Sequence, residues 1–475
     1  MTTHAAIELS AIRGCLEGAV PSMMATCAQD GTPNVAYLSQ VCYVDDRHVA
    51  LSFQFFNKTR QNILANPHAE VLVMHPRTAA FFRLRLHYLR TETSGPTFES
   101  MKAQLAGIAS HSGLAGVFKL LGSDIYEVLS IECVDGCPLP APPAPAIGLL
   151  GALRRSAERL MRCSGTDELL QATLATLNDQ MDVQHAMVLM LDASAHRLYT
   201  VASAGYATSG VGSEIEMGHG VIGVAARECT PVRISHMTNA ASYSHAVRSS
   251  MQLLEPGLAL ETDIPYPGLP EPHSQLAVPI VSTGRLLGVL FVESPLDMRF
   301  GYEDEDAMVA IAGQLGAALE LLQNAAEPAT EAPPPAPPLA SPATDAASDA
   351  ASDAESDTAP TRAQAAGGSA LELRHYRVND SVFIDGQYLI KGVAGAIVWK
   401  LLRDHAGQGR SEFSNRELRL DTSIGLPDVA DNLEARLVLL QRRLVENSPH
   451  IRIEKTGRGR FRLRVDRAVK MVEMG

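Results

Sequence analysis

The sequence of 475 residues lacks several features that would assign it to a class at once. It has no run of about 18 consecutive apolar residues, which a membrane-spanning helix needs. Its first residues, Met1-Thr2-Thr3-His4-Ala5, lack the basic start and apolar stretch of a secretory signal. The seven cysteines are odd in number and scattered, unlike a disulfide framework. We therefore expect a cytoplasmic protein in a reducing compartment.

Signatures of common signalling enzymes are also absent. The sequence contains no receiver-domain aspartate site, kinase motif or nucleotide cyclase signature. No general acid, general base or activated nucleophile stands out, so a binding function is favoured over an enzymatic one. Cys229, before Thr230-Pro231, is expected to be a small buried residue. We therefore predict no catalytic residue. We also predict no metal site, because the possible ligands do not have the spacing of a metal site: Cys229, His236, His245 and His273.

Charge is distributed unevenly along the chain. The whole sequence has a net charge of −13, with 40 Lys and Arg against 53 Asp and Glu. Residues 370–475 contain 19 Lys and Arg against 14 Asp and Glu, a net of +5, which leaves −18 for residues 1–369. A basic C-terminal segment on an acidic chain is typical of a separate anion-binding unit. The contrast supports nucleic acid as a partner of that segment.

Two low-complexity stretches divide the sequence. Residues 138–146 form a Pro-rich joint that favours a stiff, extended conformation. Residues 326–369 consist mainly of Pro, Ala, Ser and Asp and have almost nothing to bury, so we expect a disordered linker. The predicted domains are therefore residues 1–137, 147–325 and 370–468. We expect a multidomain α+β protein.

The first predicted domain is rich in strands. A short helix at about residues 7–16 precedes them, and the Asp30-Gly31 pair is a strong hairpin signal. Six or more antiparallel strands that close on themselves into a barrel are the most economical interpretation. The expected strands are residues 22–28, 34–44, 48–54, 70–75, 81–93 and 125–133, and the expected helices are 59–65 and 98–109.

Two segments of this domain carry a family resemblance. They read M-M-A-T-C-A-Q-D-G-T-P-N-V-A from Met23 and H-V-A-L-S-F-Q-F-F-N-K-T-R-Q-N-I-L-A-N-P-H-A-E-V-L-V from His48. Over most of residues 10–135 the sequence resembles the pyridoxamine-phosphate-oxidase-like FMN-binding split barrels. The resemblance implies a dimer with the cofactor at its interface.

The same resemblance implies a set of flavin-binding residues. A hydroxyl, a lysine and an arginine at the start of a helix suit a phosphate dianion. The alternative is a solvated cationic turn on a barrel that has lost its cofactor. By position, Ser52, Phe53 and Gln54 are expected to line the flavin ring, and Asn57, Lys58, Thr59 and Arg60 to bind the phosphate.

The second predicted domain begins and ends with helices, at about residues 147–161 and 303–323. Two segments between them are distinctive: G-H-G-V-I-G-V-A-A-R-E-C-T-P-V-R-I from Gly218 and S-Q-L-A-V-P-I-V-S-T-G-R-L-L-G-V-L-F-V-E-S from Ser274. Their order and spacing resemble a GAF sensor domain, an α/β sandwich. A further helix is expected at 166–182, and strands at 186–192, 198–205, 230–234, 274–281 and 286–293.

The GAF resemblance leaves the ligand open. Members of that family bind cyclic nucleotides, tetrapyrroles, haem, nitrogenous metabolites or nothing. Phe300 is followed by Gly-Tyr-Glu-Asp, unlike cyclic-nucleotide GAF domains, and no cysteine is an obvious bilin attachment site. The last helix of the domain suggests a homodimer, while the alternative is an amphipathic helix that covers its own sheet. Its coiled-coil-like positions are Met308, Ile311, Leu315, Ala318 and Leu322.

The third predicted domain combines hairpins with three helices. Asp385-Gly386 marks the turn of a first hairpin over residues 382–390, and a second hairpin joins residues 451–455 to 460–465. A helix ends near Asp404, a second covers 415–420 after the capping residue Ser414, and a third covers 429–447.

This segment is similar to the winged-helix output domain of OmpR-type response regulators, over about residues 378–466. The similarity lies in V-F-I-D-G-Q-Y-L-I-K, L-E-A-R-L-V-L-L-Q-R-R-L and I-R-I-E-K-T-G-R-G-R-F-R-L-R-V. It implies DNA contacts from the third helix and from the wing. The acidic loop before the third helix and the Gly-Arg-Gly-Arg-Phe of the wing depart from the family, and a protein-docking wing is the alternative. By position, the helix contributes Arg436, Gln441, Arg442 and Arg443, and the wing contributes Lys455, Arg458 and Arg460.

Together these domains predict a one-component transcriptional regulator. A ligand or redox signal read by the GAF domain or the flavin barrel is expected to control the winged helix. One alternative is an FMN-dependent oxidoreductase with accessory sensor domains. Another is an interaction protein whose barrel and GAF folds have lost their ligands. The expected partners are DNA, a small-molecule ligand and a second copy of the chain.

Overall fold

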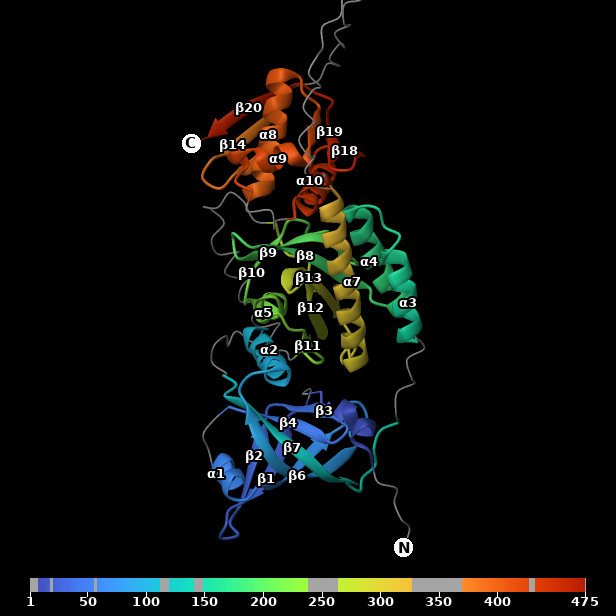
Figure 1. Cartoon of the computed structure of the whole chain (residues 1–475), viewed down its shortest axis with the longest axis vertical. Coiled ribbons are helices and arrows are strands. Elements are labelled where there is room, and N and C mark those ends of the chain that lie inside the picture. The colour runs from blue at the N-terminus through green and yellow to red at the C-terminus, as the bar shows by residue number, and fades with distance from the viewer. Residues whose placement is uncertain are drawn as a thin grey trace, which may run out of the picture. The chain divides into compact units, whose positions relative to one another are not determined.

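The computed structural model describes residues 7–17, 20–54, 58–111, 119–140, 148–237, 264–326, 370–426 and 432–474. Figure 1 labels the helices and strands of the chain. The chain divides into two compact units. The first consists of Met1–Leu322 and Pro427–Arg442, and the second of Gln323–Leu426 and Arg443–Gly475. In the described part of the chain, no helix is long and apolar enough to cross a membrane.

The N-terminal part of the first unit is a seven-stranded sheet in the order β2-β1-β5-β6-β7-β4-β3. All of its paired strands are antiparallel, as predicted. Three helices accompany the sheet in the described residues: the 3₁₀ helix η1 (Leu9–Cys15), α1 (Lys58–Ala65) and α2 (Pro96–His111). The strands are β1 (Ser22–Cys27), β2 (Pro33–Leu38), β3 (Val41–Asp45), β4 (His48–Phe53), β5 (His68–Met74), β6 (Phe81–Glu92) and β7 (Gly122–Cys133).

One predicted strand of this sheet is two strands in the structure. Residues 34–44 were expected to be continuous, but β2 ends at Leu38 and pairs with β1, whereas β3 starts at Val41 and pairs with β4. Gln40 lies in the break and is buried, with its N–H donating to Ser52 Oγ at 3.2 Å. No glycine or proline marks the break, so the sequence pattern carries no sign of the change of partner.

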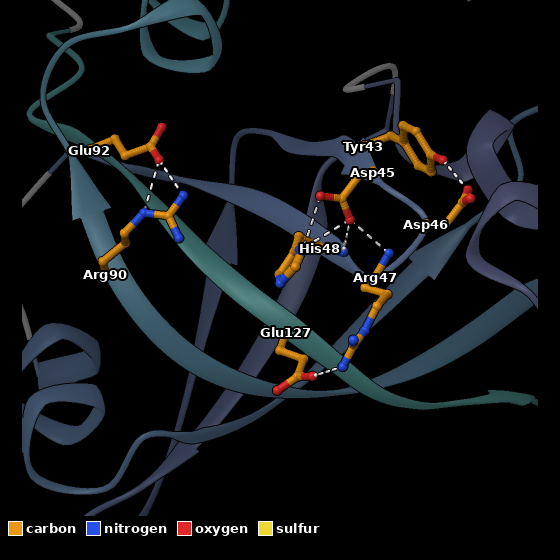
Figure 2. A network of polar contacts seen from close by, with 8 residues as sticks. All are labelled: Tyr43, Asp45, Asp46, Arg47, His48, Arg90, Glu92 and Glu127. Atoms are coloured by element: carbon orange, nitrogen blue, oxygen red, sulfur yellow. Dashed lines mark hydrogen bonds and ion pairs between the residues drawn. The ribbon is translucent and has the colours of Figure 1, made fainter.

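The turn between β3 and β4 is tied to β7 by a polar network (Figure 2). Asp45 accepts hydrogen bonds from the backbone N–H groups of Arg47 and His48 at 2.8 and 2.9 Å. The Arg47 guanidinium reaches across to Glu127 on β7 at 2.6 Å. The Arg47 side chain is 75 % exposed, so its ion pair with Glu127 stabilises the sheet by less than about 1 kcal/mol. The network therefore connects the β3–β4 turn to β7 through polar contacts near the surface.

The central part of the first unit is a six-stranded sheet in the order β10-β9-β8-β13-β12-β11. The strands and helices predicted for this segment lie within a few residues of those observed. The short strand β10 was not predicted, because no sequence pattern indicated it. The helices are α3 (Leu149–Leu160), α4 (Thr166–Met181), α5 (Gly220–Glu228) and α7 (Tyr302–Ala326). The strands are β8 (His185–Asp192), β9 (Arg197–Ala204), β10 (Glu214–Glu216), β11 (Val232–Ile234), β12 (Ser274–Ser282) and β13 (Arg285–Ser294).

The long helix α7 covers its own sheet. Met308, Ile311 and Leu315, three of the residues predicted at a dimer seam, are buried within this single chain. A Cβ on Gly316 would lie 2.7 Å from the carbonyl oxygen of Val281 on β12, so the helix approaches the sheet closely. The amphipathic-helix alternative is confirmed for these three residues, because they pack inside one chain.

Helix α2 packs between its own sheet, where Met101 contacts Ile125 of β7, and the central domain. Its Ala103 belongs to the same buried hydrophobic cluster as Val221 of α5 and Val232 of β11, and Figure 1 shows α2 beside α5. Lys102 also pairs with Glu228 of α5 at 2.9 Å. Because the helix presents small residues, its backbone can approach the neighbouring elements closely.

Gly107 of α2 provides a test of this packing. A Cβ there would lie 2.5 Å from Cγ1 of Val232, so Gly107→Ala should destabilise the protein, by roughly 1–3 kcal/mol as for other overpacked sites. The matched control is Gly313→Ala in α7, where nothing lies within 4 Å of the added Cβ and helix propensity predicts a gain of about 0.5–1 kcal/mol. Urea unfolding followed by far-ultraviolet circular dichroism measures both. Equal stabilisation by the two substitutions would contradict the packing.

The second unit contains a four-stranded sheet, β16-β15-β14-β20, and a three-stranded sheet, β17-β19-β18. The pattern missed β14, β17 and β20, which are short or lie at the ends of the segment. Helix α10 (Leu433–Asn447) passes from the first unit into the second at Arg443, and residues 429–431 of the predicted helix lie outside the described residues. The other elements are β14 (Leu371–Tyr376), β15 (Ser381–Ile384), β16 (Gln387–Ile390), α8 (Gly392–Gln408), β17 (Glu412–Ser414), α9 (Asn415–Leu420), η2 (Thr422–Ile424), β18 (Ile451–Gly457), β19 (Arg460–Val465) and β20 (Val469–Met474).

Candidate functional site

Side chains from β4, α1 and β7 converge on a pocket in the N-terminal sheet domain. The structure brings together five of the seven residues predicted to bind flavin: Ser52, Phe53, Gln54, Thr59 and Arg60. Lys58 is the exposed first residue of α1, and Asn57 lies outside the described residues. Asp124 and Tyr126 of β7 complete the wall, although no motif had singled them out.

Arg60 is already bound within the protein. Its guanidinium donates to both carboxylate oxygens of Asp124, at 2.7 and 2.8 Å, and to the hydroxyl of Thr91 at 2.7 Å. The same group lies over the ring of Phe53, 4.6 Å from its centroid. Asp124 is buried, and this burial raises the pKa of its carboxyl despite the neighbouring arginine. The predicted phosphate ligand is therefore engaged by an internal carboxylate.

Two hydroxyls of the pocket also have internal partners. The Thr59 hydroxyl accepts a hydrogen bond from Asn34 at 2.9 Å, and the Ser52 hydroxyl accepts one from the Gln40 N–H. The Gln54 amide nitrogen and the Tyr126 hydroxyl are buried without a hydrogen-bond partner among the described residues. The cavity measures about 90 Å³, whereas ligand pockets span roughly 300–1,000 Å³. As arranged in one chain, these residues do not fit a flavin.

A buried carboxyl lies within the central sheet. Glu293 of β13 is 1 % exposed and accepts hydrogen bonds from the Leu269 N–H at 2.7 Å and from the Gln275 amide at 3.0 Å. Burial raises the pKa of this carboxyl. Glu293 lies near the end of a largely apolar strand. A single acidic residue there forms no repeating pattern, so the sequence did not reveal it as a buried group.

The residues considered as metal ligands do not converge within the described part of the chain. His236 and His273 both contact Asp297, at 2.6 and 3.3 Å, and all three side chains are exposed to solvent. His245 lies outside the described residues. The expectation that Cys229 is buried was wrong, because it is exposed and caps the C-terminus of α5 with a φ of 50°.

Comparison with known families agrees with these two folds. The family model described as Pyridoxamine 5'-phosphate oxidase matches residues 9–111, and the model described as GAF domain matches residues 165–319. The chain thus carries an oxidase-type domain followed by a GAF domain. Neither family model extends into the C-terminal unit. No curated protein matches the chain.

Solved structures resemble the same two domains. The GAF domain of an Acinetobacter phosphoenolpyruvate-protein phosphotransferase is 20% identical and covers 37% of this chain and 94% of its own, with a TM-score of 0.30. An FMN-binding protein from Syntrophomonas wolfei is 15% identical and covers 26% of this chain and 84% of its own, with a TM-score of 0.23. The free methionine-R-sulfoxide reductase of Neisseria meningitidis is 18% identical. It covers 38% of this chain and 95% of its own, with a TM-score of 0.28.

A buried arginine joins the oxidase-type domain to the GAF domain. Arg233 of β11 has a side chain that is 1 % exposed. Its guanidinium pairs with Glu17, which follows η1, at 2.8 Å and with Glu305, at the start of α7, at 2.7 Å. The Tyr302 ring lies below the guanidinium, 4.5 Å away. These two carboxylates hold the pKa of Arg233 above its usual range despite burial.

The residues predicted to contact DNA fall into two groups. Gln441 of α10 is exposed. The three residues predicted in the β18–β19 hairpin are exposed too: Lys455, Arg458 and Arg460. The arginines of α10 are engaged by other groups: Arg436 pairs with Asp192 at 3.0 Å, Arg442 with Asp167 at 2.7 Å, and Arg443 donates to the Leu389 carbonyl at 3.1 Å. The structure therefore does not assemble the predicted helix residues into one exposed face.

The buried joint between the two domains gives a direct test by mutation. Arg233→Met leaves Glu17 and Glu305 without their shared partner, so it should cost roughly 3–5 kcal/mol of unfolding free energy. The control is Arg227→Met, because the side chain of Arg227 is 49 % exposed and its ion pair should contribute less than about 1 kcal/mol. Urea unfolding of the full-length chain compares them. An equal loss of unfolding free energy in the two variants would contradict the importance of the Arg233 ion pairs for holding the two domains together.

Proposed function

We propose that this chain is a cytoplasmic one-component transcriptional regulator in which the oxidase-type and GAF domains sense a ligand or a redox signal and control a DNA-binding C-terminal unit. The observation that carries the proposal is the order of elements in the C-terminal part of the chain, from α8 onward. Helices α8, α9 and α10 are followed by the β18–β19 hairpin, with β17 as a third strand. Three helices followed by a hairpin support a winged-helix domain, whose third helix and wing contact DNA.

The sensing half of the proposal is supported by the two family matches and by the Arg233 joint. GAF and oxidase-type domains occur in series in the first unit. A guanidinium buried between Glu17 and Glu305 resists separation of the two domains, because each charge would be left unpaired. A ligand in either domain can therefore shift the other, which coupling between two sites requires. A second copy of the chain completes the proposal, since a dimer presents two DNA-binding units.

The full-length chain should bind DNA in a sequence-dependent manner. In a selection from a pool of random-sequence duplexes, we expect a shared sequence to be enriched after several rounds. Because the pool holds every short sequence, the experiment does not depend on a known target. Folded full-length protein that enriches no sequence above a protein-free pool would contradict the proposal.

The alternative is an FMN-dependent oxidoreductase. It is favoured by the match to the oxidase family over residues 9–111 and by the convergence of Ser52, Phe53 and Gln54 on one pocket. The cavity of about 90 Å³ and the engagement of Arg60 by Asp124 weigh against it in a single chain. A flavin would need additional space from a second chain and a rearranged Arg60.

An absorption spectrum separates these candidates. Because the pocket is small and its arginine already has partners, we expect purified full-length protein to be colourless and to stay so after incubation with FMN and desalting. Flavin bands that are lost in Lys58→Ala and kept in Lys119→Ala would instead establish the flavin alternative. Lys119 is the matched control, since it is an exposed lysine outside the pocket.

A further inference from the structure

The three-stranded sheet of the second unit has one apolar face and one charged face. Residues of β18 and β19 alternate between buried and exposed, with Ile451, Ile453, Phe461 and Leu463 buried. The alternate positions face solvent, as the period of two in a strand requires. Four arginines occupy the exposed face, which we call the arginine face: Arg452 on β18 and Arg460, Arg462 and Arg464 on β19.

The strand register places two of these arginines against each other. Arg452 lies directly opposite Arg464 in the antiparallel pair. Like charges in directly opposite positions destabilise a sheet, because the side chains of such a pair lie only about 5 Å apart at their Cβ atoms. The fold does not require charge at either position, since both point to solvent. This arrangement is therefore more readily explained by an anionic partner than by stability.

The acids on the same face neutralise only part of this charge. Glu412 of β17 contacts Arg462 at 2.5 Å, and Glu454 of β18 contacts Arg464 at 3.2 Å. All four side chains are at least 41 % exposed, so these pairs are weak and can be exchanged for contacts to another anion. Within the described part of the chain, Arg452 and Arg460 have no ion pair.

The spacing of the arginines suits a regular row of phosphates. Alternate residues of a strand are about 7 Å apart, so Arg460, Arg462 and Arg464 leave the same face of β19 at that interval. Successive phosphates along one nucleic acid strand have a similar separation. Arginine also donates two parallel hydrogen bonds to a phosphate, which lysine cannot do. A row of such groups fits a polyphosphate backbone better than it fits a single small anion.

We propose that the arginine face is a phosphate-backbone surface, on which the strands β18 and β19 lie along one strand of a DNA duplex. This inference rests on the proposed DNA-binding function and adds to it. The resemblance-based set placed wing contacts at Lys455, Arg458 and Arg460, near the turn, whereas the arginine face extends along the strands to Arg452 and Arg464. Its contacts go to phosphates and supply affinity without sequence information.

The test compares two double variants of the full-length chain. Arg452→Gln/Arg464→Gln removes the facing pair of like charges, so the sheet should be as stable as in the wild type or more stable. The control, Arg83→Gln/Arg85→Gln, removes the same charge from exposed positions on β6 of the oxidase-type domain. Thermal unfolding by circular dichroism checks that both variants fold. Binding is measured by fluorescence anisotropy with a labelled random-sequence duplex at several salt concentrations.

Arg452→Gln/Arg464→Gln should weaken duplex binding roughly tenfold and lower the slope of log affinity against log salt by about 2, one for each lost phosphate contact. The control should change neither quantity. Wild-type affinity and slope in the first variant would overturn the arginine face while leaving DNA binding intact. A wild-type chain that binds no duplex at low salt would overturn this inference and the proposed function together. Binding to anionic phospholipid vesicles but not to the duplex would assign the face to a membrane instead.

Discussion

The guanidinium of Arg233 is the interaction on which the first unit depends. It is buried, and a buried charge is tolerated only when its partners compensate for the water it has lost. Here the partners come from two domains, since Glu17 follows η1 and Glu305 lies in the first turn of α7, the long helix of the GAF domain. If the domains separated, all three charged groups would be exposed to water or left without an ion-pair partner. The two domains thus belong to one compact unit, and these ion pairs connect them.

Apolar packing reinforces the same joint. Helix α2 belongs by sequence to the oxidase-type domain but contributes Ala103 to the hydrophobic cluster of the GAF domain. Gly107 leaves no room for a side chain against Val232, which neighbours Arg233 in sequence. The electrostatic and the apolar contacts therefore meet on strand β11. This strand is therefore the element of the GAF sheet that carries both kinds of contact with the N-terminal domain.

Local signals predicted much of the secondary structure. The Asp30-Gly31 and Asp385-Gly386 turns formed where expected, with φ of 87° and 83° at the two glycines, because their sequences favour those backbone conformations. Ser414 caps α9 as predicted: its hydroxyl accepts from the Glu417 N–H, and its own N–H donates to the Glu417 carboxylate. Such features depend on a few neighbouring residues. They can therefore be read from the sequence alone.

Features that depend on distant partners could not be predicted. Arg60 had the residue type and position of a phosphate ligand, but its partner Asp124 lies 64 positions away in the chain and no pattern links the two. Arg233 stands in a segment used to identify the GAF domain, yet its role arises from Glu17, 216 positions earlier. The arginines of α10 likewise had a DNA-reading pattern, while the structure engages Arg443 with a backbone carbonyl. Residue type and spacing indicate which ligands a side chain could bind. They do not show whether another group of the same chain already binds that side chain.

Hydrogen exchange tests the central claim, that the oxidase-type and GAF domains unfold and act as one body, most directly. Amide exchange of the full-length protein would be measured by mass spectrometry at increasing urea concentrations. If the domains are one cooperative unit, peptides from the N-terminal sheet, such as β6, and from β12 and β13 of the GAF sheet should lose protection at the same urea concentration. Loss of protection in β6 while the GAF strands stay protected would contradict the claim, and would mean that the Arg233 joint does not couple the two domains.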